Sequence, residues 1–116
     1  MDYYKAMLTI VELPEFQRRA EALITELEKQ SIINYLALHP HDGVIMQGTG
    51  GIRKLRWATG GKGKSGGVRV VYYVHNESMP LFLLSLFGKS EKSNLSKSER
   101  NELAKFTSLL VKSYGA

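Results

Sequence analysis

The chain has 116 residues, of which 43% are hydrophobic and 23% charged; it carries a net charge of +5 and no cysteine. This composition excludes a disordered chain, and the length fits one compact domain over residues 1–116. Without cysteine there is neither a disulfide framework nor a thiolate metal site. The N-terminus lacks the order of a signal peptide and no apolar run is long enough to span a membrane, so we expect a cytoplasmic protein without a membrane partner.

The N-terminal part of the chain predicts a strand followed by a helix. The segment MLTIVEL at residues 7–13 alternates apolar and polar side chains, as a half-buried strand does. Pro14 then suits the first position of a helix, because its φ angle is already helical and its missing N–H is not needed there. We expect this helix to run to about Ile24.

A second helix is predicted from Thr25 to the neighbourhood of Pro40. Thr25 and Glu28 have the spacing of a capping box, in which each side chain accepts a hydrogen bond from the backbone of the other residue. In both helices apolar side chains recur every three to four residues, so we expect an amphipathic hairpin packed on an apolar surface. The expected apolar positions are Phe16, Ala20, Leu23, Leu27, Tyr35 and Leu38.

Three apolar runs predict an antiparallel meander: 52–58, 68–74 and 81–87. With the N-terminal strand they make a small antiparallel, mixed-edge sheet of about four strands. Ser96 and Glu99 repeat the capping-box spacing and open a C-terminal helix that can cover part of the sheet. The predicted fold class is therefore α+β, with a helical hairpin and a C-terminal helix packed on the sheet.

The positive charge is gathered in the middle of the chain. No carboxylate lies between Asp42 and Glu77, whereas the cations of that stretch are Arg53, Lys54, Arg56, Lys62, Lys64 and Arg69. These cations would repel one another unless they faced an external polyanion, so phosphate is the expected partner. A solvated basic face that only aids solubility is the alternative, but solubility does not require so long a stretch without acids.

Alternation along the predicted strands assigns these residues to faces. Lys54 and Arg56 fall on one face of the sheet, and Arg53 falls on the other with Leu55 and Trp57. One of the two tyrosines that end the next strand must pack in the core. Since Tyr72 lies on the face opposite to Arg69, it is the expected core residue.

Two other motifs suggest different chemistry. Residues 58–65 (ATGGKGKS) fit a relaxed phosphate-loop pattern, but the residues that follow predict a strand where a phosphate loop needs a helix. His39, His41 and Asp42 could suggest a metal site, although histidines around a proline at a helix end are typical of a turn. We therefore expect neither a metal nor another cofactor.

Cations on neighbouring strands can act on RNA without a metal. Paired strands lie about 4.8 Å apart, so their side chains can converge on one phosphodiester. RNA supplies its own nucleophile, the 2'-hydroxyl, and cleavage then needs a base, an acid and charge that stabilises the phosphorane. A lysine among other cations can serve as the base, whereas arginine stays charged and clamps the phosphate. Tyrosine can stack on a base or pass a proton.

Three segments together resemble HigB-type toxins of the RelE/ParE superfamily: 47–58 (QGTGGIRKLRWA), 61–73 (GKGKSGGVRVVYY) and 86–95 (LFGKSEKSNL). The pattern G-K-G-K-S-G-G-x-R is the most specific part, and the flanking helices match only by their pattern. The resemblance implies a RelE-like fold and a toxin that enters the ribosomal A site and cleaves messenger RNA there. It also implies a cognate HigA- or RelB-like antitoxin, with a helix-turn-helix fold, that holds the toxin inactive and can form a DNA-binding complex with it.

The resemblance also assigns candidate residues. Family toxins carry an arginine soon after the lysine that follows the last strand, and a tyrosine farther on, whereas this chain has Ser90 and the Leu95-Ser96 neighbourhood there. Lys92 and Tyr73 are the candidates to replace them. The candidate catalytic residues are thus Lys54, Arg56, Arg69, Tyr73, Lys89 and Lys92. The candidate RNA- or ribosome-binding residues are Arg53, Lys62 and Lys64.

Two alternatives remain open from the residues alone. The ParE branch has the same fold and acts on a protein target such as gyrase, with no RNA chemistry. A passive nucleic-acid-binding module would also carry a basic sheet. The dense row of cations favours RNA cleavage, with Arg56 and Arg69 on the phosphate and Lys54 and Lys89 in proton transfer.

Overall fold

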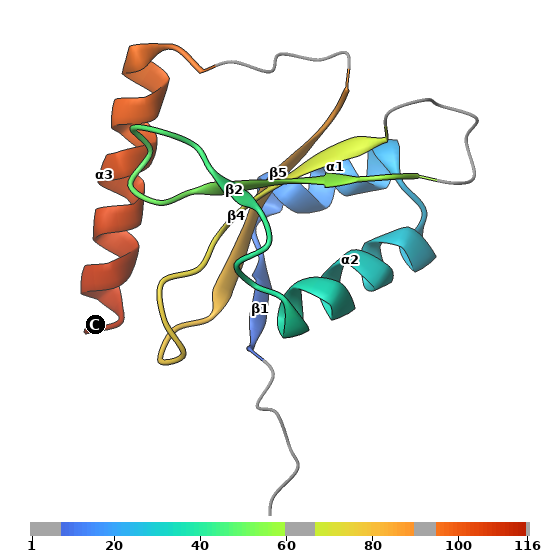
Figure 1. Ribbon diagram of the computed structural model, residues 1–116, viewed down its shortest axis with the longest axis horizontal. Coiled ribbons are helices and arrows are strands. Elements are labelled where there is room, and N and C mark those ends of the chain that lie inside the picture. The colour runs from blue at the N-terminus through green and yellow to red at the C-terminus, as the bar shows by residue number, and fades with distance from the viewer. Residues whose placement is uncertain (1–7, 60–66, 90–94, 116) are drawn as a thin grey trace, which may run out of the picture.

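The computed structural model describes residues 8–59, 67–89 and 95–115, and these form one sheet with helices on both of its sides (Figure 1). The hairpin α1–α2 lies on one side and α3 on the other, so the predicted α+β class is confirmed. The elements are β1 (Ile10–Glu12), α1 (Pro14–Leu23), α2 (Glu26–Leu38), β2 (Val44–Ile45), β3 (Arg53–Trp57), β4 (Val68–Tyr73), β5 (Leu81–Gly88) and α3 (Lys97–Ser113).

The sheet has five strands in the order β1-β5-β4-β3-β2. Strand β1 runs parallel to β5 and every other neighbour is antiparallel, which makes the sheet mixed at one edge. The predicted count of about four strands is one short, because β2 was not expected. Strand β2 has two residues, which pair with Lys54 and Arg53, and a segment so short shows no alternation that could reveal it.

The helix boundaries follow the local signals in the sequence. Pro14 opens α1, and both capping boxes form: the hydroxyls of Thr25 and Ser96 each accept from a backbone N–H at 3.1 Å. In return, the carboxylates of Glu28 and Glu99 each accept from the backbone of the capping residue at 2.9 Å. These local bonds satisfy N–H groups that the first turn of a helix leaves unpaired.

The expected apolar face of α2 was partly wrong. Leu27 is 81% exposed and Leu38 39% exposed, whereas Ile32 and Leu36 are fully buried. At 3.6 residues per turn, the five residues from Leu27 to Ile32 rotate the side chain by about 140° away from the buried side. The helix therefore packs through Ile32 and Leu36, which lie four residues apart. Both this pair and the expected positions fit the spacing of a helix, so the spacing alone did not show which of them are buried.

Each face of the sheet has its own apolar core. On the side of α1 and α2, the buried residues of the sheet include Val70, Tyr72 and Leu83. On the side of α3 they include Val71 and Phe82, which pack with side chains of α3: Leu103, Phe106, Leu110 and Val111. The central strands are therefore buried on both faces wherever a helix covers them.

The loop between β2 and β3 holds α3 in place (Figure 1). The guanidinium of Arg100 in α3 donates to the carbonyl oxygen of Gln47 at 3.0 Å. Gly50 has a φ of +79°, and a Cβ at this position would lie 2.3 Å from Thr107 Oγ1. The close approach of loop and helix therefore depends on glycine at position 50.

Candidate active site

Three predicted cations lie together on the face of the sheet that α3 partly covers. Arg56 of β3 pairs directly with Arg69 of β4, and Lys54 lies two residues before Arg56 on the same face. Directly opposed residues of antiparallel strands have Cβ atoms about 4.5–5.5 Å apart. Lys54, Arg56 and Arg69 therefore form what we call the cationic cluster, and the predicted assignment of faces is confirmed.

The cationic cluster is accessible to a ligand. Arg56 is exposed, and Lys54 and Arg69 are half-buried. Within the described ranges, Lys54 and Arg56 form no ion pair with a carboxylate. Because neither charge is neutralised within the described part of the chain, a polyanion that reaches this face meets two uncompensated positive charges.

Lys89 lies at the same end of the sheet. Gly88 ends β5 opposite Val68, and Lys89 follows it directly as an exposed residue. Arg69, Arg56 and Lys89 thus come from neighbouring strands at one end of the sheet. Lys62, Lys64 and Lys92 lie outside the described residues.

Tyr73 does not join the cationic cluster. It is only 5% exposed and belongs to the core on the α3 side, at the other end of β4 from Arg69. Its hydroxyl lies 3.4 Å from Nδ1 of His75, and burial raises the pKa of its phenol above the ordinary value. The expectation that one tyrosine packs in the core is met by Tyr72, but Tyr73 is buried as well, because α3 covers this part of the face.

Arg53 is also placed away from the cationic cluster, on the opposite face. Its Nη1 donates to the carbonyl oxygens of His41 at 3.1 Å and Gly43 at 2.8 Å. The buried hydroxyl of Tyr72 accepts from the backbone N–H of Gly43 and donates to the carbonyl of Pro40, each at 2.8 Å. The guanidinium of Arg53 thus holds the turn between α2 and β2, and its expected role in RNA binding stays a prediction.

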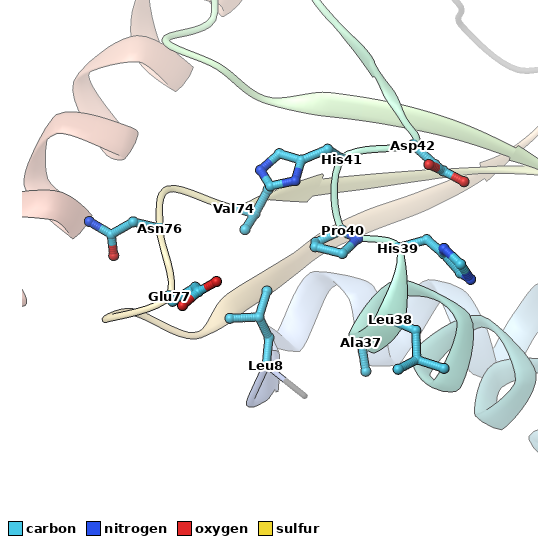
Figure 2. A pocket seen from close by; sticks show the side chains of 10 residues that line it. All are labelled: Leu8, Ala37, Leu38, His39, Pro40, His41, Asp42, Val74, Asn76 and Glu77. Atoms are coloured by element: carbon cyan, nitrogen blue, oxygen red, sulfur yellow. The ribbon is translucent and has the colours of Figure 1, made fainter. Parts of the chain in front are cut away.

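The two histidines of that turn point in different directions (Figure 2). They line a cavity of about 380 Å³ between the end of α2 and the β4–β5 connection. In Figure 2 the ring of His41 points to one side of the turn, while His39 and Asp42 point to the other. Asp42 accepts a hydrogen bond from Tyr35, which raises the pKa of that phenol. No group of three or more potential ligands of the His, Cys, Asp or Glu type is found among the described residues.

The glycine-rich segment is followed by a strand and not by a helix. Strand β4 begins at Val68, immediately after the segment that fits the phosphate-loop pattern. Residues 60–66 themselves lie outside the described ranges. A phosphate loop binds phosphate through backbone N–H groups at the N-terminus of the helix that follows it. Here the strand β4 follows, so the main feature of that motif is missing.

One feature beside the cationic cluster was not expected from the sequence. A cavity of about 490 Å³ lies between the sheet and the start of α3, and Phe87 is among the residues that line it. Phe87 pairs directly with Arg69 across β4 and β5. Simple alternation from Leu81 and Leu83 would place Phe87 on the opposite face, and the bulge in the pairing of β4 with β5 brings it to this one.

The fold and the cationic cluster define a class of protein: a small α+β domain that presents positive charge on the open half of a sheet. A family model described as RelE toxin of RelE / RelB toxin-antitoxin system matches residues 14–115. The chain belongs to the RelE toxin family, as the resemblance predicted. It is thus a toxin of a toxin–antitoxin system, for which the family implies a cognate antitoxin as partner. No described helix is long and apolar enough to cross a bilayer.

Proposed function

We propose that this toxin is a metal-independent endoribonuclease that cuts messenger RNA in the ribosomal A site and so stops translation in the cytoplasm. The observation that supports it most is the convergence of Lys54, Arg56 and Arg69 on one accessible face. Three positive charges on directly paired or next-but-one residues can stabilise the negative charge that develops on the phosphorane during cleavage. The partner that restrains it is a HigA- or RelB-like antitoxin.

In the proposed reaction, the 2'-oxygen of the RNA attacks the adjacent phosphorus. Lys54 accepts the proton of the 2'-hydroxyl, and Lys89 donates a proton to the 5'-oxygen as its bond to phosphorus breaks. The products are a 2',3'-cyclic phosphate and a 5'-hydroxyl end. Arg56 and Arg69 hold the non-bridging oxygens, because arginine stays protonated and can donate two parallel hydrogen bonds. Lys62, Lys64 and Lys92 remain candidates for contacts with the RNA backbone or for replacing a family residue.

The test is to map RNA ends after the toxin is added to a translating extract. We expect codon-spaced cuts in translated transcripts with the intact protein, and none with Arg69→Ala. Lys105→Ala is the matched control, because it removes an exposed cation from α3 away from the cationic cluster. Binding to the antitoxin should survive Arg69→Ala, which shows that the variant is folded.

Two results would reject the proposal. Intact messages together with damaged DNA would indicate a ParE-like action on a protein target. Cleavage that disappears with a zinc-selective chelator, which leaves the magnesium of the ribosome in place, would indicate a metal mechanism. Retained cutting by Arg69→Ala would reject the assignment of that arginine.

A further inference from the structure

The cavity beside the cationic cluster has an apolar wall. Strand β5 contributes Leu84, Ser85 and Phe87, β4 contributes Val71, and Leu103 faces them from α3. Leu84 and Val71 are each 8% exposed, whereas Ser85 and Phe87 are half-buried. The cavity, of about 490 Å³, is therefore formed by well-packed residues of the sheet with an aromatic ring accessible at its edge.

The strand register joins this cavity to the cationic cluster. Phe87 is the direct neighbour of Arg69, and Ser85 pairs with Val71, which in turn pairs with Lys54. A ligand group on Arg69 and a ligand group on Phe87 are thus one strand spacing apart, about 4.8 Å. Val71 pairs with Ser85 but Tyr72 with Leu83, so Leu84 is an extra residue and joins Ser85 in lining the cavity.

The cavity and the cationic cluster differ in chemistry, and this limits the ligand that can occupy both. The charged groups that line the cavity have both signs, the carboxylates of Glu15 and Glu99 and the guanidinium of Arg19, so the cavity lacks the excess of positive charge that a phosphate site needs. Arg19 also lines it, and its Nε donates to the carbonyl oxygen of Leu86 at 2.8 Å. A ligand that fits must have an anionic group next to a flat, neutral group with polar edges, and a nucleotide has this form.

We propose that this cavity binds a nucleobase of the RNA substrate, stacked on Phe87, while Arg69 and Arg56 hold the phosphate next to it. The inference rests on the proposed function and adds that the toxin itself senses the base at the cut. An aromatic side chain beside a phosphate-binding cation is a common way to hold a single-stranded base. Glu99 is fixed in the capping box of α3, so its carboxylate is held at the cavity as an acceptor for the edge of the base.

An acidic segment of the antitoxin is the other ligand with an anionic part and an apolar part. Glu15 is paired with Arg18 and Arg19 lines the same cavity, so the charge of the lining does not decide against an acidic segment. A nucleobase is neutral and presents N–H groups that a carboxylate can accept. The direct pairing of Phe87 with Arg69 favours a nucleotide, whose base and phosphate lie close together in one molecule.

The test compares variants of the full-length toxin in the same translating extract. Phe87→Leu keeps an apolar side chain but removes the stacking ring, and Phe87→Tyr keeps the ring. We expect Phe87→Leu to lower the cleavage rate by about tenfold and to change the distribution of bases at the cut, since stacking on one aromatic ring is worth about that factor. Phe87→Tyr keeps the ring, and we expect it to cut at the same positions and to retain more of the cleavage rate than Phe87→Leu.

Two further variants separate the cavity from the stability of the fold. Phe82→Leu removes a ring from the same strand, but Phe82 is buried on the part of the face that α3 covers and does not line the cavity. It should lower the melting temperature and leave the cut positions unchanged. Ser85→Leu fills the cavity without removing the ring, and we expect it to reproduce the loss seen with Phe87→Leu.

The outcomes distinguish the inference from the proposed function. If the unmodified toxin cuts no RNA, the proposed function fails. If it cuts, and Phe87→Leu and Ser85→Leu cut the same bases at the same rate, the nucleobase cavity is wrong while the endoribonuclease stands. If these variants lose affinity for the antitoxin but keep their cleavage pattern, the cavity belongs to the antitoxin and the inference is also overturned.

Discussion

The two faces of strand β3 use the same kind of side chain in opposite ways. Arg53 and Arg56 lie three residues apart in one strand, and alternation sends them to opposite faces of the sheet. Arg53 donates to two backbone carbonyls of the turn after α2, whereas Arg56 is exposed beside Arg69. A dense run of cations in a sequence therefore does not identify a site until each charge is assigned to a face and its neighbours are known.

The difference arises from what packs on each face. On the face where Arg53 lies, α2 and its C-terminal turn bring carbonyl oxygens to Arg53 and to the hydroxyl of Tyr72. On the face where Arg56 lies, α3 covers Tyr73 and Phe82 but packs away from Arg56, which stays exposed. Arg53 of this strand therefore stabilises the fold, because a turn supplies hydrogen-bond acceptors to it. Arg56 of the same strand can bind a ligand, because no helix covers it.

The largest expected effect comes from the exposed arginine of this pair. Arg56→Ala should lower the rate of RNA cleavage by about a hundredfold, the effect of removing one donor to a developing oxyanion. The melting temperature should stay close to that of the parent, because an exposed side chain contributes little to stability. The measurements are the rate of RNA cutting in a translating extract and a thermal unfolding curve. Unchanged cleavage would place Arg56 outside the site.

The other arginine should behave in the opposite way. Arg53→Ala leaves the carbonyls of His41 and Gly43 without their charged donor, and we expect the free energy of unfolding to fall by about 2 kcal/mol. Below the melting temperature, the cleavage rate per folded molecule should not change. Urea unfolding and the cutting assay check the two halves of this prediction. A variant that is as stable as the parent but inactive would reverse our assignment of the two faces.

Tyr72→Phe tests the same turn with a smaller change. The ring stays, but the hydroxyl that joins Gly43 N–H and Pro40 C=O is lost, which leaves the N–H unpaired in a buried place and the carbonyl unpaired in a partly buried one. We expect a loss of about 1–2 kcal/mol in the free energy of unfolding, with cleavage retained. Urea unfolding at neutral pH measures it. A loss of activity without a loss of stability would contradict the structural role of the turn.

The pH dependence of Tyr72 sharpens that test. Burial raises the pKa of its phenol above the ordinary tyrosine value of 10.0, so the folded protein holds this proton more tightly than the unfolded chain. The stability that this group contributes is complete below about pH 10 and is lost as the pH rises through the pKa of the folded state. The difference in stability between the parent and Tyr72→Phe should therefore shrink above pH 10. A difference that is constant into alkaline solution would show that the phenol does not titrate with unfolding.

The contrast between the two faces was predictable in part from the sequence. Alternation in β3 separates Arg53 from Arg56 because the period of a strand is two, and the capping boxes at Thr25 and Ser96 depend on residues only three positions apart. What Arg53 binds depends on a turn that folds back from α2, and the burial of Tyr73 depends on where α3 docks. Local patterns do not encode these long-range contacts, so the sequence alone does not show that Arg53 holds a turn or that Tyr73 is buried.

The smallest expected effect comes from the two capping boxes, which lie on opposite sides of the sheet. Ser96→Ala and Thr25→Ala each remove one hydroxyl that accepts from a backbone N–H, and we expect each to cost about 1 kcal/mol of stability. Neither should change the cleavage pattern, because the bond from Ser96 N–H to Glu99 remains and keeps that carboxylate at the cavity. Urea unfolding and mapping of RNA ends measure both quantities. If Ser96→Ala shifts the cut positions while Thr25→Ala does not, the start of α3 contributes to the choice of base through its backbone and not only through Glu99.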